Sequence, residues 1–339
     1  MHPILSVRDL KVHFPVHGGL FMQQKGAVRA VDGVSLDIAR GETVGLVGES
    51  GCGKSTLGKA IVRLVNPTAG SVTFDNFDIT HRAQRTLKPV RRELQMIFQD
   101  PVESLNARLS VREIVEEPLV IHGIGNSASR RKKVDELLSK VGLPKGAAEK
   151  YSFEFSGGQR QRIGIARAIA LEPKMIVCDE PVSALDVSVQ SQVLNLLLEL
   201  QQEMGLSYLF IAHDLAVVKH ISDRVAVMYL GKIVELADAD KIYRDPRHAY
   251  TKALLSAIPE PDPTIRKPRI LLEGDVPSPI NPPAGSAFGH RINHPRYPET
   301  VGQPLPLVEI EPGHWVAADP CCLSEADWRV ASEKVAALV

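Results

Sequence analysis

Residues 48–55 read Gly48-Glu49-Ser50-Gly51-Cys52-Gly53-Lys54-Ser55, which matches the pattern G-x-x-x-x-G-K-[ST]. An apolar run ending at Val47 precedes this segment and an amphipathic run from Ser55 to Leu64 follows it, so we expect it to join a strand to a helix. Glycines allow such a loop to aim several N–H groups at one phosphate, and the helix N-terminus adds partial positive charge. The segment therefore predicts a nucleotide-phosphate cradle formed by Gly48 to Ser55 and the next residue, Thr56.

Four side chains are expected to act on the bound phosphates. Lys54 should reach the β- and γ-phosphates, and Ser55 should offer its hydroxyl to Mg²⁺. The run Met175-Ile176-Val177-Cys178-Asp179-Glu180 places apolar residues before two acids, which indicates a buried strand that delivers carboxylates to the ligand-binding edge of a parallel sheet. Asp179 suits holding Mg²⁺, and Glu180 suits polarising an attacking water molecule. A strand ending in acids is common, so this prediction depends on the phosphate cradle.

Composition limits the class of protein. The chain has 339 residues, with 40 Lys and Arg against 40 Asp and Glu, so the formal net charge is zero. This balance disfavours a nucleic-acid binder that relies on overall positive charge, and 5% aromatic residues disfavour base-stacking platforms. The sequence lacks an apolar run of about eighteen residues, so we do not expect it to span a membrane. No signal peptide is apparent at the N-terminus, and the cytoplasm is the expected compartment.

The order of apolar runs predicts an α/β fold. Strand patterns at 43–47 and 175–179 are each followed by a helical pattern, which is typical of a largely parallel sheet covered by helices. The helix expected near 188–204 should end at Gly205 and should bury a stripe made of Val189, Val193, Leu196, Leu197, Leu200 and Met204.

Residues 101–155 predict a helical insert in this α/β core. Ser110 and Glu113 form a plausible capping box at the start of one helix. A second helix is expected from about Ser129 to Val141, and it carries a basic run at 130–133. A solvated helix face is the preferred interpretation of that run, and a docking site for an acidic or phosphate-bearing partner is the alternative.

A further motif identifies the family. Phe155-Ser156-Gly157-Gly158-Gln159 resembles the LSGGQ signature of ABC-type ATPases, with Phe155 in place of leucine. Ser156 is a good N-cap and Gln159 a good third helical residue, so the segment should open a helix that binds an anion. One chain cannot readily bring this helix and the phosphate cradle to the same γ-phosphate. The resemblance therefore implies two ATPase subunits that share each ATP molecule.

Other segments match the same family. Gln99 looks like its Q-loop glutamine, which senses Mg²⁺ and the membrane partner; Ser183 to Asp186 looks like its D-loop; and His213 looks like its switch histidine, which contacts the γ-phosphate. The family usually stacks an aromatic ring on adenine before the phosphate cradle. A gapless reading places Lys25 there, and Phe14 or Phe21 can serve if residues 18–19 loop out.

Proline usage divides the chain. Fifteen of the 24 prolines lie between Pro246 and Pro320, and nine precede them. We therefore expect an ABC nucleotide-binding domain over 1–245, with a helical subdomain at about 101–158, and a proline-rich extension over 246–339. The family resemblance implies a P-loop NTPase core whose sheet is mostly parallel with an antiparallel β portion. Residues 247–259 and 277–283 are similar to the extension on ATP-binding subunits of dipeptide and oligopeptide ABC importers, although Ala249 replaces the usual proline. Residues 179–190 also look like this subgroup.

Cysteine usage separates this chain from many of those relatives, whose extensions bind an iron–sulfur cluster. Here the corresponding stretch, Ser286 to Ile292, contains no cysteine, and Cys321 and Cys322 are the nearest. Cluster ligation normally needs four thiolates, so we predict no iron–sulfur cluster. Cys178 is expected to be a small core residue, whereas Cys52 is expected to be exposed in the cradle and open to oxidation.

The resemblance implies an ATP-hydrolysing subunit of a peptide-type ABC importer, bound to the cytoplasmic face of the inner membrane. It implies ATP and Mg²⁺ as ligands, with two integral membrane permease subunits and a second ATPase subunit, identical or paralogous, as partners. An external solute-binding protein would act indirectly, and no nucleic acid is expected.

Close relatives carry nickel, opines or sugars. A non-transport ABC ATPase acting on ribosomes or DNA is the alternative, although such proteins usually carry two cassettes or a long coiled-coil insert. A phosphate-loop kinase or regulatory GTPase has no use for residues 156–159.

Overall fold

The computed structural model describes residues 2–18, 23–258, 270, 272 and 275–337. The chain folds into two compact units. Unit 1 comprises the N-terminal segment up to Ser6 together with 37–43 and 73–212. Unit 2 comprises 7–36, 44–72 and the chain from His213 onward.

The sheet of unit 1 is parallel and buried. Its strands follow the order β8 (Ser207–Ile211), β7 (Met175–Asp179) and β6 (Leu94–Ile97). Every residue of β7 and β8 is buried, which explains their continuous apolar sequences, because helices cover both faces of such strands. The strand predicted at 175–179 is confirmed, and it ends at Asp179 as expected.

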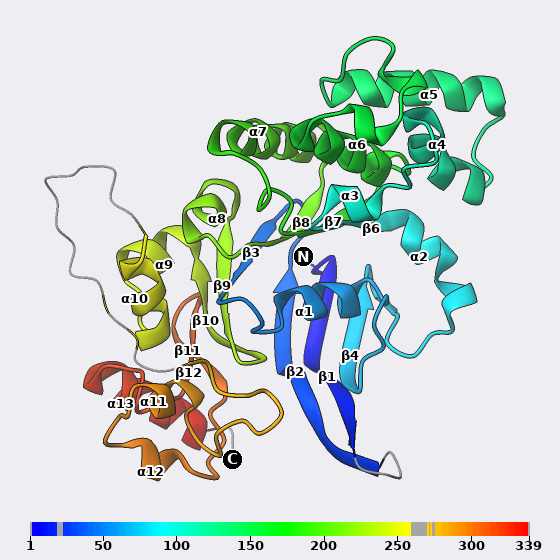
Figure 1. The fold of residues 1–339 in the computed structure, drawn as a ribbon. Helices are drawn as coiled ribbons and strands as arrows, with labels where there is room; N and C mark the ends of the chain where they lie inside the picture. The colour runs from blue at the N-terminus through cyan, green and yellow to red at the C-terminus, as the bar shows by residue number, and fades with distance from the viewer. Residues whose placement is uncertain (1, 19–22, 259–269, 271, 273–274, 338–339) are drawn as a thin grey trace, which may run out of the picture. The chain divides into compact units, whose positions relative to one another are not determined.

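Helices α4 (Val111–Ile121), α5 (Ser127–Lys140) and α6 (Gly157–Ile169) pack together in unit 1 (Figure 1). The predicted capping box is confirmed, since Ser110 and Glu113 cap α4 through reciprocal hydrogen bonds. The other helical elements before α6 are η1 (Gln84–Leu87), α2 (Lys88–Glu93), α3 (Pro101–Ser104), η2 (Ala147–Glu149) and η3 (Ser152–Glu154).

The basic run on α5 contacts acids of the same chain. Arg130 lies 2.6 Å from Glu116, and Lys133 lies 2.6 Å from Glu172. Arg131 and Lys132, between these two basic residues, are exposed, which fits the preferred interpretation of a solvated helix face.

Helix α7 (Val187–Met204) confirms the amphipathic pattern read from the sequence. Val193, Leu196, Leu197 and Leu200 are buried, whereas Val189 and Met204 at the ends of the stripe are half-buried. Gly205 ends the helix with a φ of 65°, a left-handed conformation that glycine adopts without steric cost.

The sheet of unit 2 is mixed. β3 (Thr43–Val47) lies parallel to β9 (Arg224–Tyr229), which pairs antiparallel with β10 (Lys232–Asp238). β10 then pairs antiparallel with β12 (His314–Ala317), and β12 pairs with β11 (Leu307–Glu311). The expected combination of parallel and antiparallel β-structure is therefore confirmed. The C-terminal extension adds its own strands to the sheet that carries β3.

The long strands β1 (Leu5–Gly18) and β2 (Gln23–Ile38) are neighbours, and β1 also neighbours β4 (Ala69–Phe74). The end of β4 pairs antiparallel with β5 (Phe77–Asp78) in unit 1. Unit 2 also contains α1 (Lys54–Ile61), α8 (Leu215–Ile221), α9 (Ala239–Arg244), α10 (Ala249–Ser256), α11 (Ala287–Arg291), α12 (Tyr297–Thr300) and α13 (Glu325–Ala336).

A buried carboxylate fixes the extension to β10. Glu235 is fully buried, and its oxygens accept hydrogen bonds from the backbone N–H groups of Arg247 and His248 and from Nε2 of His314. The extension also has a small core of its own, in which Val308, Ala318 and Ala331 are buried. Among the residues that the structure describes, no helix combines the length and hydropathy needed to cross a bilayer.

Candidate functional site

The phosphate-binding loop lies in unit 2 between β3 and α1. Gly53 is the N-cap of α1 with a φ of 107°, and a Cβ atom there would lie 1.9 Å from the carbonyl oxygen of Ala30. A Cβ atom on Gly48 would lie 2.1 Å from the carbonyl oxygen of Met228. Glycine is required at both positions because the loop passes too close to neighbouring backbone for any side chain. The result is a compact cradle at a helix N-terminus, which fits a phosphate group.

Lys54 lies inside this loop. Its side chain is buried, and Nζ donates to the carbonyl oxygen of Gly48 at 2.8 Å and to that of Glu49 at 3.0 Å. A buried ammonium group needs such acceptors, because removing a charge from water is costly. The loop therefore holds one positive charge at its centre. Ser55 and Thr56 follow in the first turn of α1 and are half-buried.

The prediction that Cys52 is exposed is wrong. The Cys52 side chain is only 2% exposed, and its carbonyl oxygen accepts a hydrogen bond from the N–H of Gly231 at 2.9 Å. Burial raises the pKa of the Cys52 thiol, although nearby Lys54 opposes the shift. A protonated, buried thiol is a poor nucleophile, so Cys52 has the properties of a packing residue.

The acids at the end of β7 lie in unit 1 together with Gln99. Asp179 is buried, and Glu180 is half-buried with a φ of 46°, in the left-handed region that few residues other than glycine adopt. Glu180 donates its backbone N–H to the carbonyl oxygen of Ile211. Nε2 of Gln99 donates to Oε2 of Glu180 at 3.0 Å. The structure thus joins two residues that the sequence places 81 positions apart.

Residues 156–159 form an open helix N-terminus, also in unit 1. The backbone N–H of Ser156 donates to Oε1 of Gln159 at 3.0 Å, and the backbone N–H of Gln159 donates to Oγ of Ser156 at 3.4 Å. The predicted cap is therefore confirmed. Ser156 and Gly157 are exposed, so this N-terminus is accessible to an anion from another molecule.

The two glycines of this motif have different environments. A Cβ atom on Gly158 would lie 2.3 Å from a methyl carbon of Val189 on α7, whereas one on Gly157 would meet Leu185 at an ordinary 3.4 Å. Gly158 thus allows α6 to approach α7 closely. Asp186 caps α7, since its Oδ1 accepts the N–H of Val189 at 3.0 Å.

His213 is exposed and lies between β8 and α8. It belongs to unit 2, as the phosphate-binding loop does, whereas Gln99, Asp179 and Glu180 belong to unit 1. Of the candidates for adenine stacking, Phe14 lies on β1 and Lys25 on β2, and both are exposed. Phe21 lies outside the described residues.

Glu49 has two partners that the sequence analysis missed. Its backbone N–H donates to the hydroxyl oxygen of Tyr250, and its carboxylate pairs with Arg291. These partners lie 201 and 242 residues away in the sequence. Neither belongs to a local motif, so no sequence signal identifies them.

The buried thiols of the extension do not fit an iron–sulfur cluster. Cys322 donates its S–H to Oδ2 of Asp319 at 3.2 Å, and the Ser286 hydroxyl donates to the same oxygen. Burial, followed by the charge of Asp319, raises the pKa of the Cys322 thiol well above its usual range. Cluster ligands are thiolates, so this environment opposes ligation. His248 also lies near Asp319 and Cys322, but its Nδ1 already accepts the N–H of Tyr250.

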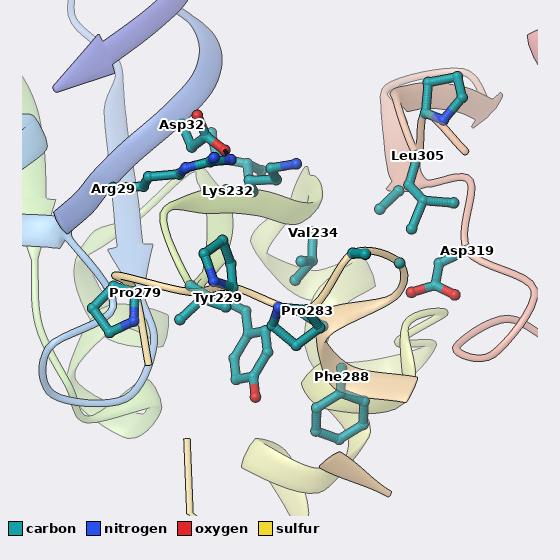
Figure 2. A pocket seen from close by; sticks show the side chains of 18 of the residues that line it. Arg29, Asp32, Tyr229, Lys232, Val234, Pro279, Pro283, Phe288, Leu305 and Asp319 are labelled. Carbon is teal, nitrogen blue, oxygen red and sulfur yellow. Dashed lines mark ion pairs between the residues drawn. The ribbon is translucent and has the colours of Figure 1, made fainter. Parts of the chain in front are cut away.

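Figure 2 shows a separate cavity of about 540 Å³ in unit 2. Arg29 and Asp32 on β2, Lys232 on β10 and the proline-rich segment at 279–285 line it. Tyr229 and Phe288 lie on the same side of the loop that carries Pro279 and Pro283 (Figure 2). Residues 48–56 are not among those that line the cavity. The cavity is therefore distinct from the phosphate cradle.

Comparisons with known proteins agree with this geometry. A family profile described as ABC transporter matches residues 31–183. A second profile, described as the C-terminal region of oligopeptide and dipeptide transporters, matches residues 234–294. The first match contains the phosphate-binding loop, and the second contains Tyr250 and Arg291.

Similar proteins share most of the chain. A putative oligopeptide transport ATP-binding protein of Bacillus subtilis (strain 168), YkfD, is 54% identical over 319 residues, which covers 93% of this chain and 94% of the relative. OppF of Escherichia coli (strain K12), an oligopeptide transport ATP-binding protein, is 54% identical over 293 residues, 85% of this chain and 88% of OppF. A dimeric structure of the cassette MJ0796 with ADP and phosphate is 29% identical, with a TM-score of 0.62, over 69% of this chain and 98% of that one.

Proposed function

This chain belongs to the ATP-binding proteins of ABC transporters, whose members are ATPases, and we propose that it drives a peptide importer. The similarity that supports peptide as the solute extends beyond the ATPase core. It includes the extension, which matches the C-terminal region of oligopeptide and dipeptide transporters. The named relatives with half or more identical residues are oligopeptide or peptide transport proteins.

One observation carries the proposal. The chain contains both a phosphate-binding loop around Lys54 and an exposed helix N-terminus at Ser156 and Gly157. A kinase or GTPase needs the first of these features and has no use for the second. A chain that offers both can contribute its loop to one ATP molecule and its α6 N-terminus to another, which favours a dimeric ATPase.

The phosphate-binding loop, residues 48–56, would hold the phosphates of ATP through backbone N–H groups and the Lys54 ammonium. Its fit rests on the glycine-lined backbone and on the buried charge of Lys54, which is complementary to a polyanion. Ser55, Gln99 and Asp179 have the hydroxyl, amide and carboxylate oxygens that Mg²⁺ prefers, and they would hold that ion. Mg²⁺ supplies positive charge beside the phosphate oxygens when it is bound.

We infer that the second ATPase subunit contributes Ser156 to Gln159 to each bound ATP, with Asp186 near the shared boundary. Closure of the two subunits excludes water from the site and completes the set of catalytic groups. Glu180 orients the attacking water and accepts its proton, while Lys54 and His213 stabilise the charge that develops on the γ-phosphate. Release of ADP and phosphate then allows the subunits to separate.

The proposed domains have the boundaries that the sequence predicts. We propose an ABC nucleotide-binding domain over 1–245, with its helical subdomain at about 101–158, and a transporter-type extension over 246–339. The chain would bind at the cytoplasmic face of the inner membrane, with two integral membrane permease subunits and a second ATPase subunit as partners. An external solute-binding protein would act through the permease. We propose that the chain binds neither nucleic acid nor an iron–sulfur cluster.

Reconstitution tests the function. The chain is assembled with its permease and binding-protein partners in vesicles, and ATP-dependent uptake of a labelled oligopeptide is measured. We expect uptake with the parental chain and none with Lys54→Ala, because loss of the ammonium weakens nucleotide binding. Failure of the chain to copurify with any integral membrane subunit would contradict the proposal, and copurification with ribosomes would favour the non-transport alternative.

A further inference from the structure

A single peptide unit connects the extension to Lys54. The unit between Gly48 and Glu49 offers its carbonyl oxygen to Nζ of Lys54 at 2.8 Å and its N–H to the hydroxyl oxygen of Tyr250 at 2.9 Å. A trans peptide is planar, with its C=O and N–H groups pointing in opposite directions. Fixing the N–H therefore fixes the direction of the carbonyl. Tyr250 thus sets the orientation of one of the acceptors that hold the Lys54 ammonium.

Arg291 holds the side chain of the same residue. Its Nη1 lies 2.7 Å from Oε2 of Glu49, and its Nη2 lies 3.2 Å from Oε1. This two-pronged contact restricts the carboxylate in both position and plane, and the Arg291 side chain is only 8% exposed. The carbonyl oxygen of Glu49 is a second acceptor for Lys54. Glu49 is therefore fixed at its N–H and at its carboxylate while it contacts the catalytic lysine.

Tyr250 has little freedom to move. Its side chain is fully buried, and its ring packs against Tyr229 at a centroid distance of 4.5 Å and against Phe288 at 5.4 Å. Tyr229 and Phe288 also contact each other edge to face at 5.6 Å. These three rings join β9, α10 and α11. Burial raises the pKa of the Tyr250 hydroxyl, so the group remains neutral and its oxygen accepts the Glu49 N–H.

The extension holds α10 and α11 in place by further buried contacts. The N–H of Ala249, at the start of α10, donates to the carbonyl oxygen of Cys322 at 2.8 Å. Ser286 caps α11 by accepting the N–H of Gly289 at 2.8 Å, and its hydroxyl donates to Asp319. The positions of Tyr250 and Arg291 thus depend on segments of the extension that lie far apart in the sequence.

We propose that the extension positions the phosphate-binding loop, with Tyr250 and Arg291 as its positioning residues acting through Glu49 on Lys54. Neither residue need touch the nucleotide. Their role is to keep the loop in the conformation that accepts phosphate, so that the cost of ordering it is met before binding. This inference rests on the proposed function in taking MgATP as the ligand.

Substitutions at Tyr250 and at Arg291 test the two contacts separately. Tyr250→Phe keeps the packed ring but leaves the Glu49 N–H without its acceptor, and we expect MgATP affinity to fall roughly 5- to 30-fold. Hydrogen exchange at the Glu49 amide should accelerate roughly 10-fold or more. Arg291→Gln should also weaken MgATP binding. Arg291→Lys should recover part of the loss, because it restores the charge without the two-pronged geometry.

Matched controls separate positioning from general stability. Tyr243→Phe removes another tyrosine hydroxyl of unit 2, which is half-buried and donates to the carbonyl oxygen of Leu215 rather than to a group of the loop. Arg296→Gln removes an arginine of the extension that pairs with Glu299. Both controls should keep parental MgATP affinity and parental exchange at Glu49. The KM for MgATP should rise in the test variants by a larger factor than kcat falls, since the proposed defect lies in loop positioning.

The outcomes distinguish this inference from the function on which it rests. Folded Tyr250→Phe and Arg291→Gln chains with parental MgATP affinity and unchanged exchange at Glu49 would overturn the positioning role. If Tyr250→Phe does not fold, the MgATP affinities of Arg291→Gln and Arg291→Lys decide whether the positioning role holds. A parental chain that bound no MgATP would overturn the proposed function, whereas exchange at the Glu49 amide would still decide whether Tyr250 restrains the loop.

Discussion

Gln99 and Glu180 are joined by a hydrogen bond of 3.0 Å between Nε2 of Gln99 and Oε2 of Glu180. The contact connects the second residue after β6 to the residue after β7, at the carboxyl ends of neighbouring parallel strands. Glu180 adopts a left-handed conformation, which is costly for a residue with a side chain. The structure thus holds a proposed catalytic carboxylate in a constrained backbone and a defined side-chain contact.

Glu180→Gln should remove the proton acceptor while leaving the phosphate-binding loop intact. We expect ATP hydrolysis to fall roughly 10²-fold or more, with ATP affinity close to the parental value. Single-turnover hydrolysis and equilibrium nucleotide binding measure the two quantities. Hydrolysis at the parental rate would show that another group activates the water.

Gln99→Ala should lower the rate of ATP hydrolysis, and Gln99→Glu should lower it further. Alanine removes the hydrogen bond to Glu180, whereas glutamate places a second carboxylate beside it and displaces the side chain by like-charge repulsion. We expect kcat to fall roughly 10-fold in Gln99→Glu, since hydrogen-bond partners of a catalytic base act mainly on the chemical step. Equal kcat values for the parental chain and Gln99→Glu would argue against a functional contact.

Gly158→Ala should destabilise unit 1, because the new methyl group would overlap Val189. We expect a loss of about 1–3 kcal/mol in the free energy of unfolding, measured by urea denaturation. Gly157→Ala is the matched control and should stay within about 0.5 kcal/mol of the parental chain. Val189→Ala in the Gly158→Ala background should recover stability. A Gly158→Ala chain as stable as Gly157→Ala would contradict the close packing of α6 on α7.

The extension should lose stability in two steps as the pH falls. Burial holds the pKa of His248 below its ordinary value of 6.5, so folding favours the neutral ring and stability declines as the pH drops below that value. Burial alone would raise the pKa of Glu235, but hydrogen bonds from His314 and from the backbone N–H of Arg247 hold it below 4.5. A second loss therefore begins below pH 4.5, where the carboxylate of the unfolded chain takes up a proton that the folded one does not, and it is complete once the folded carboxylate is protonated as well.

The pH dependence of thermal unfolding checks this assignment. His248→Asn keeps an oxygen that can accept the N–H of Tyr250 but cannot titrate, and Asn is a favoured N-cap residue. Its melting temperature should fall less steeply than that of the parental chain between about pH 7 and pH 5. Parallel curves for the two proteins would assign the acid sensitivity to other groups.

Local patterns predicted the elements that carry the proposed site. The strand at 175–179, the helix that ends at Gly205 and the cap formed by Ser156 and Gln159 each depend on residues close together in the sequence. Short-range signals of this kind are sufficient to predict helices, strands and caps, because periodicity and capping act over a few residues.

The environment of the phosphate-binding loop was less predictable. The exposure expected for Cys52 is wrong because β9 and the turn after it cover the loop, and the N–H of Gly231 bonds to the Cys52 carbonyl oxygen. Tyr250 and Arg291 contact Glu49 from the far end of the chain. Contacts of this kind arise from tertiary packing, which a single sequence does not encode in any local pattern.

ATP-dependent dimerisation tests the central proposal most directly. Glu180→Gln and the double variant Glu180→Gln/Gly157→Asp are sedimented with and without MgATP, each alone and with the paralogous ATPase subunit, if the transporter has one. We predict that MgATP converts the single variant to a dimer and that the double variant remains monomeric, because an aspartate at the α6 N-terminus repels the phosphate of the shared ATP. The account would be contradicted if the parental chain hydrolysed ATP at full rate as a monomer and the Gly157→Asp variant hydrolysed it at the same rate.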